Sequence, residues 1–146
     1  VNDDGRFRDA SSWSGDGLLL ARVSRGSAAV DIDEDGDLDL AVANNVGPAT
    51  LLRNDLEGDH GWLQISLIGP AQGGVPIVEV DPIPTGIRQR RQVRISGGYL
   101  SSDDIRLHFG LGTTATTADV TVTWSDGAVL RQRGVAATQH LVLRRR

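Results

Sequence analysis

The sequence predicts an all-β protein in which a short hairpin unit precedes a β-sandwich. Its 146 residues include 18 glycines but only 4% aromatic residues, a composition typical of a turn-rich fold. Short apolar runs recur along the chain and are separated by Gly, Asp, Asn and Pro clusters. Runs of that length with such boundaries indicate strands rather than helices. The length suits one domain, or one domain and a piece of another.

The first unit reads as strand, loop, strand, turn, strand. An apolar run at 28–30 leads into the acidic segment 31–39, and a second apolar run follows at 40–43. Residues 44–48 carry turn chemistry and 50–52 form a third apolar run. A helix is disfavoured because Asp and Gly are poor helix formers and no apolar i, i+3, i+4 stripe crosses the loop.

The second unit follows a polar linker at 54–61 and reads as a series of short strands. In the segment 120–124 the apolar residues alternate with Thr, which predicts one buried and one solvated sheet face. Ser125-Asp126-Gly127 then supplies hairpin-turn residues. We expect seven strands and hence a β-sandwich, at Trp62–Ile68, Ile77–Val80, Arg88–Ile95, Ile105–Phe109, Val120–Trp124, Val129–Arg133 and His140–Leu143.

Charge divides the chain at the same place. Residues 1–60 carry 13 acids and 5 arginines, whereas 61–146 carry 6 acids and 10 arginines. We therefore expect two domains, 1–58 and 59–146, the first of them with a cation site. The absence of Cys excludes disulfides, and no apolar run reaches the roughly 18–20 residues of a membrane span. Because the chain starts with Val1 and lacks Met, we expect a C-terminal fragment whose signal peptide lies outside it.

The segment DIDEDGDLD, residues 31–39, predicts a calcium site. Ca²⁺ takes six to eight oxygen ligands, which alternate side chains of a tight loop can provide. Gly36 permits the sharp turn, and an EF-hand is excluded because Val42 stands where that loop needs a bidentate Glu. Ca²⁺ fits such a flexible loop better than Mg²⁺, which requires near-octahedral geometry. The expected ligands are Asp31, Asp33, Asp35, Asp37 through its backbone carbonyl, and Asp39; the alternative is a solvated acidic turn.

Other candidate sites receive plainer interpretations. His60, His108 and His140 are too far apart in sequence to indicate a zinc site. The basic residues of 88–94 fit an edge strand protected by charge, with sulfated glycan or anionic polysaccharide as the alternative partner. Nucleic acid is not expected, because the chain is acidic overall and this stretch lacks interleaved aromatics. No Gly-x-Ser-x-Gly elbow accompanies the serines, so we expect no enzyme.

Two family resemblances extend this interpretation. RGSAAVDIDEDGDLDLAVANNVGPATLLRND (25–55) resembles an FG-GAP/VCBS-type repeat, the calcium-binding blade of integrin-like β-propellers. GWLQISLIGP (61–70), GGYLSSDDIRLHFGLG (97–112) and VTVTWSDGAVLRQRGVAATQHLVL (120–143) are similar to the ASPIC/UnbV domain of cartilage acidic protein-like proteins. Residues 1–58 would then be the terminal, partial blade of a propeller, because one blade cannot bury its faces alone.

These resemblances imply a secreted or cell-surface protein that binds Ca²⁺, and they imply no established enzymatic activity for the C-terminal domain. We expect an extracellular interaction or adhesion module, with Ca²⁺ in a structural role and an unidentified extracellular protein or glycan as partner. The alternative is the C-terminal accessory region of a larger secreted enzyme, which would direct that enzyme to polysaccharide.

Overall fold

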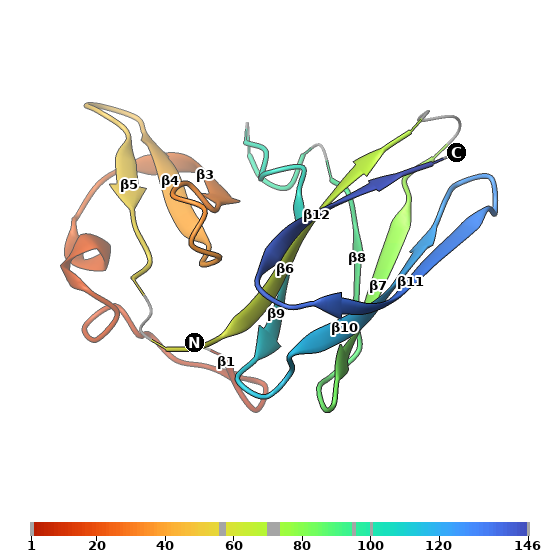
Figure 1. Cartoon of the computed structure of the whole chain (residues 1–146). Helices are drawn as coiled ribbons and strands as arrows, with labels where there is room; N and C mark the ends of the chain where they lie inside the picture. The colour runs from red at the N-terminus through yellow and green to blue at the C-terminus, as the bar shows by residue number, and fades with distance from the viewer. Residues whose placement is uncertain (1, 56–57, 70–73, 95, 100, 146) are drawn as a thin grey trace.

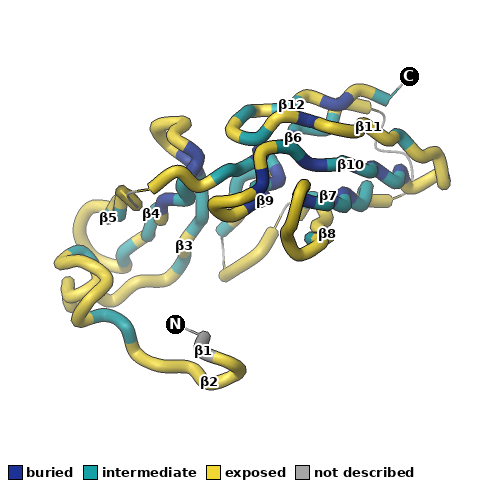
Figure 2. The backbone as a smooth tube through the Cα atoms, turned by 60° about the horizontal axis from the view of Figure 1, so that its bottom comes forward, coloured by how far each residue is buried: buried dark blue, intermediate teal, exposed yellow. Residues whose placement is uncertain are grey.

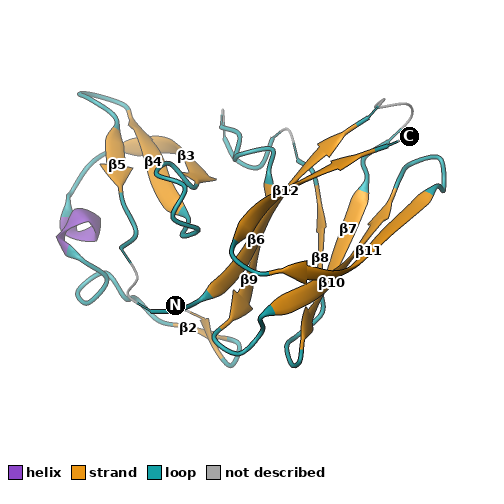
Figure 3. Ribbon diagram, viewed as in Figure 1, coloured by secondary structure: helices purple, strands orange, loops and turns teal. Residues whose placement is uncertain are grey.

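The computed structural model describes residues 2–55, 58–69, 74–94, 96–99 and 101–145, and in them the chain is all-β (Figure 1, Figure 3). Leu56 and Glu57 of the expected linker, and Ile95 of an expected strand, lie outside the described residues. One 3-10 helix, η1, spans Asp16–Leu19. The strands are β1 (Asn2–Asp3), β2 (Arg6–Phe7), β3 (Ser24–Val30), β4 (Asp39–Asn44), β5 (Thr50–Leu52), β6 (Gly61–Ile68), β7 (Ile77–Ile83), β8 (Gln89–Gln92), β9 (Leu107–Gly112), β10 (Thr117–Thr123), β11 (Val129–Ala136) and β12 (Gln139–Arg144).

Strands β3, β4 and β5 form an antiparallel three-stranded sheet. The predicted order of strand, loop, strand, turn, strand is confirmed. The acidic loop connects β3 to β4, and Asn44 fixes the following turn by donating from Nδ2 to the Pro48 carbonyl (2.7 Å) and to Thr50 Oγ1 (2.9 Å). Those two bonds replace backbone pairing where the chain reverses.

Strands β6 to β12 form two sheets that face each other, consistent with the predicted sandwich. One sheet has the order β11-β10-β7-β8 and the other β12-β6-β9. In the second sheet β12 runs parallel to β6, so the last strand of the chain pairs with the first strand of this unit. The seven strands correspond in number and order to the seven expected.

Several predicted strands have boundaries that differ from the observed ones, and for two of them a local reason is visible. The strand expected at 88–95 is β8, Gln89–Gln92; Arg88 instead forms an ion pair with Asp81. The strand expected from Ile105 begins at Leu107, since Asp104 accepts a hydrogen bond from the Arg106 backbone N–H (2.9 Å). A carboxylate that bonds the backbone two residues later forms a turn and delays the strand.

The hydrophobic core lies between the two sheets of the sandwich. Alternate residues of its strands point inward, and Leu63, Phe109 and Val122 are fully buried. The described core residues all lie between Leu63 and Leu143. Figure 2 shows the same division, with buried backbone concentrated in the sandwich strands and mostly exposed backbone in the N-terminal part. Hydrophobic burial therefore stabilises the sandwich far more than the N-terminal sheet.

The N-terminal sheet is attached to the sandwich through β3 and the acidic loop. The Ala29 backbone N–H donates to Asp103 Oδ1 (2.8 Å), and the Asp104 N–H donates to the Ala29 carbonyl (3.2 Å). A Cβ at Gly26 would lie 2.9 Å from the Tyr99 carbonyl oxygen, so backbones meet closely here as well. These polar contacts hold the acidic loop beside β6 and β9.

Candidate metal centre

The acidic loop brings three carboxylates together. One carboxylate oxygen from each of Asp31, Asp33 and Asp35 lies within 4.8 Å of the others. Three ionised groups at that spacing repel one another by about 1 to about 3.5 kcal/mol per pair, for effective dielectric constants of about 80 to about 20. The alternation of Asp along the sequence predicted this cluster, and its oxygen-only chemistry suits a hard cation.

Asp31 contributes the buried member of the cluster. The residue is 2% exposed, and its Oδ2 accepts a hydrogen bond from the Gly36 backbone N–H (3.2 Å). Asp31 Oδ1 is buried and has no hydrogen-bond partner among the described residues. A buried carboxylate oxygen without a partner carries a large desolvation penalty, and a bound cation would remove it.

Burial also acts on the protonation of Asp31. Desolvation raises the pKa of its carboxyl, while hydrogen bonds from the Gly36 and Glu34 backbone lower it in part. The nearby Asp35 charge raises the pKa further, and the Arg106 charge lowers it. In the absence of a cation the folded loop thus disfavours ionised Asp31, as expected of a metal ligand without its metal.

The two remaining aspartates occupy different positions. Asp39 is 1% exposed; its Oδ2 accepts from the Ile32 N–H (3.0 Å) and its Oδ1 from the Asn54 N–H (2.8 Å). The Asp37 backbone N–H donates to Asp35 Oδ1 (2.8 Å). Asp39 therefore links the start of the loop to the segment that follows β5. Its role as a ligand, like that of the Asp37 carbonyl, remains a prediction.

Gly36 forms the turn of the loop and is covered by the sandwich. Its φ of 97° lies in the left-handed region that favours glycine, as the sequence predicted. A Cβ at this position would overlap the indole ring of Trp62 on β6. His108 on β9 donates from Nε2 to the Gly36 carbonyl (2.7 Å), since a carbonyl can only accept. The apex of the loop thus rests on two side chains of the sandwich.

Two arginines reduce the negative charge of the loop. Arg106 donates to the Asp31 carbonyl (3.3 Å), lies 3.7 Å from a Glu34 carboxylate oxygen and pairs with Asp104 at 2.6 Å. Arg53 pairs with Asp55 (2.7 Å) and lies 3.7 Å from Asp33 Oδ2. Neither guanidinium donates a hydrogen bond to Asp31 Oδ1, so the buried oxygen keeps no hydrogen-bond partner among the described residues. Sequence reasoning missed Trp62, His108 and Arg106, because all three are distant from the loop in the chain.

The histidines do not gather around a metal site within the described ranges, where the acidic triad is the one group with suitable spacing. His140 Nε2 instead lies 2.7 Å from Ser66 Oγ on the neighbouring strand. A nucleophilic serine also needs its histidine oriented by a third group, and His140 forms no ion pair with a carboxylate in the described part of the chain.

Comparison with known proteins gives a family match in the C-terminal part. Residues 77–146 match the model of the protein family described as ASPIC and UnbV. The match starts at β7 and includes β7 to β12. Strand β6 lies outside the match, although its Leu63 and Ile65 belong to the same hydrophobic core. Neither curated proteins nor solved structures gave a match to this chain. The expected ASPIC/UnbV domain is thereby confirmed over 77–146, and the resemblance of 25–55 to an FG-GAP/VCBS repeat stays a prediction.

Proposed function

We propose that this chain is a calcium-binding extracellular interaction module with no catalytic activity of its own. The observation that carries the proposal is Asp31 Oδ1, a buried and unpartnered oxygen beside the carboxylates of Asp33 and Asp35. Ca²⁺ at this point would provide the missing partner and replace the repulsion between carboxylates by attraction. Asp37 and Asp39 complete the proposed ligand set.

The proposed role of the ion is structural. The loop apex contacts Trp62 and His108, and its first residue contacts Arg106, so a rigid loop would fix the N-terminal sheet against the sandwich. The described part of the N-terminal sheet contributes no residue to the hydrophobic core. We therefore assign to Ca²⁺ much of the energy that orders this junction.

The proposed location is the outside of a cell, either secreted or at the surface, with an unidentified protein or glycan as partner. No helix in the described ranges has both the length and the apolar character to cross a membrane. Exposed apolar side chains on and beside the N-terminal sheet, such as Val23, Leu40 and Leu51, suit the faces of a terminal propeller blade, which a neighbouring blade would cover.

Titration calorimetry with CaCl₂ tests the metal site. We expect binding with a Kd of about 10⁻³ M or tighter, the range of extracellular modules, and weaker heats with MgCl₂. Asp33→Asn should abolish the binding, whereas Asp4→Asn, at an exposed position in the β1–β2 turn, should leave it unchanged. No calcium uptake at millimolar concentration by the unaltered chain would contradict the proposal.

A second candidate function is the accessory role in a larger secreted enzyme, with this chain directing it to polysaccharide. The observation that favours it is a cavity beside β8 into which arginines project. Affinity electrophoresis in gels containing acidic or neutral polysaccharide tests this candidate, since a binding module is retarded and a non-binding one is not.

A further inference from the structure

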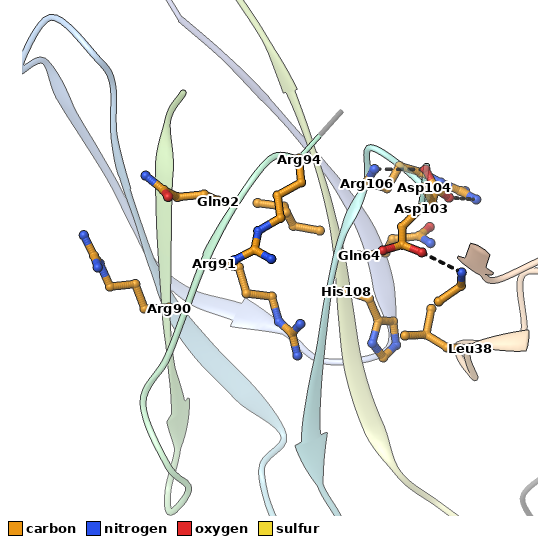
Figure 4. A pocket seen from close by; sticks show the side chains of 12 residues that line it. Leu38, Gln64, Arg90, Arg91, Gln92, Arg94, Asp103, Asp104, Arg106 and His108 are labelled. Atoms are coloured by element: carbon orange, nitrogen blue, oxygen red, sulfur yellow. Dashed lines mark hydrogen bonds and ion pairs between the residues drawn. The ribbon is translucent and has the colours of Figure 1, made fainter. Parts of the chain in front are cut away.

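A cavity of about 480 Å³ lies where the two sheets of the sandwich meet the N-terminal sheet. Its lining residues come from β6, β8, β9 and the loop before β9, together with Ala29 and Leu38; Figure 4 shows most of them. Strands β8 and β9 are each the outermost strand of their sheet, so the cavity follows two open sheet edges. Cavities of this size at junctions between folded units are common ligand sites.

Register decides which cations of β8 face the cavity. Arg91 is paired with the buried Val78 and so points to the inner side of the sheet, whereas Arg90 is paired with Glu79 and points outward. In Figure 4 Arg91 and Arg94 project toward the space between β8 and β9, and Arg90 projects away from it. Two guanidinium groups therefore face the same cavity.

Neither of these two cations is neutralised. Arg91 lies over the ring of Phe109, 5.5 Å from its centroid, and forms no ion pair with a described residue, nor does Arg94. The two aspartates in the lining are otherwise engaged: Asp103 accepts from the Ala29 N–H, and Asp104 pairs with Arg106. Because Arg90 points outward, three arginines stand against two aspartates in the lining, so the cavity is cationic in a chain whose net charge is −4.

The other end of the cavity offers neutral hydrogen-bonding groups. Gln64 on β6 is 2% exposed and lines the cavity with its amide side chain. His108 beside it uses Nε2 for the Gly36 carbonyl, which leaves Nδ1 as an acceptor. An amide and an imidazole nitrogen can both bond the hydroxyl groups of a ligand.

Protection of the sheet edge alone does not account for this arrangement. A single inward charge suffices to prevent edge-to-edge pairing, and the exposed Arg90 serves the same end. Arg94 lies beyond the end of β8, so it does not protect the hydrogen-bonding edge of that strand. Gln64 lies on β6, the central strand of its sheet, and so has no edge to protect. Arg91, Arg94 and Gln64 have in common that they line one cavity.

We propose that this cavity binds an acidic saccharide. The guanidinium groups of Arg91 and Arg94 would pair with a uronate carboxylate or a sulfate, for which planar donors are well suited. The Gln64 amide and the free Asp103 oxygen would bond sugar hydroxyls. An acidic peptide fits less well, because its side chains would find only three apolar residues in the lining, namely Ala29, Leu38 and Leu107. The inference gives the second candidate function a site, and it does not depend on the metal.

Calorimetry with trigalacturonate and with a sulfated disaccharide tests the assignment, and the preferred probe shows which anion is recognised. Maltotriose is the neutral control and a hexaglutamate peptide the competing class. We expect the chain to bind one of the acidic saccharides. The double variant Arg91→Gln with Arg94→Gln should lower the affinity for that saccharide about tenfold or more. Arg90→Gln, on the same strand but facing outward, should change the affinity less than about twofold, and thermal melts check that each variant is folded.

Four results would overturn the assignment. Unchanged affinity of the double variant, or tighter binding of hexaglutamate than of either saccharide, would remove the cavity as a saccharide site. Binding of the neutral trisaccharide alone would do the same and leave the polysaccharide-targeting function standing. Binding of no saccharide at millimolar concentration would remove both.

Discussion

The indole ring of Trp62 packs against Gly36 so closely that a methyl group on that glycine would overlap it. Trp62 lies on the first strand of the sandwich, and Gly36 is the turn residue of the acidic loop. The proposed metal site is therefore not a feature of the N-terminal sheet alone. Its apex takes its shape from the sandwich, and ordering of the loop is linked to the contact between the two units.

Gly36→Ala tests this contact. The substitution should destabilise the calcium-loaded chain by about 1–2 kcal/mol for the left-handed backbone and by about 1–3 kcal/mol more for the overlap with Trp62. Gly127→Ala is the matched control, because Gly127 has a φ of 87° and no atom lies within 4 Å of the point that its new methyl group would occupy. Urea unfolding followed by tryptophan fluorescence measures both. If both variants lose the same free energy of unfolding, the indole contact contributes nothing to stability.

Asp31→Asn should have opposite consequences with and without calcium. Burial raises the pKa of Asp31, so its ionised form is disfavoured in the folded state, and a neutral amide relieves that cost. In EDTA the variant should have a melting temperature equal to or higher than that of the unaltered chain. In calcium it should lack the rise in melting temperature that calcium gives the unaltered chain. Thermal melts under both conditions check this. A variant that melts lower in EDTA would show that the carboxylate is not a cost to the metal-free fold.

His108→Ala should weaken calcium binding although His108 is not an expected ligand. The side chain donates to the Gly36 carbonyl, and loss of one such bond, about 1 kcal/mol, corresponds to about fivefold in affinity. His140→Ala is the control, since His140 contacts Ser66 instead. Calorimetric titrations of the two variants measure the difference. If both bind calcium equally well, the loop and the sandwich are energetically independent.

Phe109→Ala should unfold the sandwich more readily than any comparable change in the N-terminal part. Phe109 is fully buried, and such truncations cost about 3–5 kcal/mol. Phe7→Ala, at a residue 86% exposed, should cost less than about 0.5 kcal/mol. Chemical denaturation followed by circular dichroism compares them, and similar losses would contradict the placement of the core.

The sequence predicts the strands well because their signal is local. Alternation in the segment 120–124 and turn residues at 125–127 indicate β10 and its hairpin without knowledge of the partner strand. The acidic triad is predictable for the same reason, since alternate side chains of one short loop converge whatever surrounds them. Strand ends are less predictable, as Asp104 shows by delaying β9 through a single hydrogen bond.

Long-range contacts could not be predicted in this way. Nothing local indicates that β12 pairs with β6 in parallel, or that Trp62 and His108 contact the loop. His108 lies on β9, but its hydrogen-bond partner is Gly36 of the acidic loop. The cavity beside β8 likewise depends on how three sheets meet, whereas the sequence showed only a run of arginines.

A crystal structure of the chain grown with CaCl₂ tests the central claim most directly. We predict an ion at about 2.3–2.6 Å from Asp31 Oδ1, with oxygens of Asp33 and Asp35 completing part of its coordination. An ordered loop in which Asp31 Oδ1 contacts only water, at a calcium concentration of several millimolar, would contradict it.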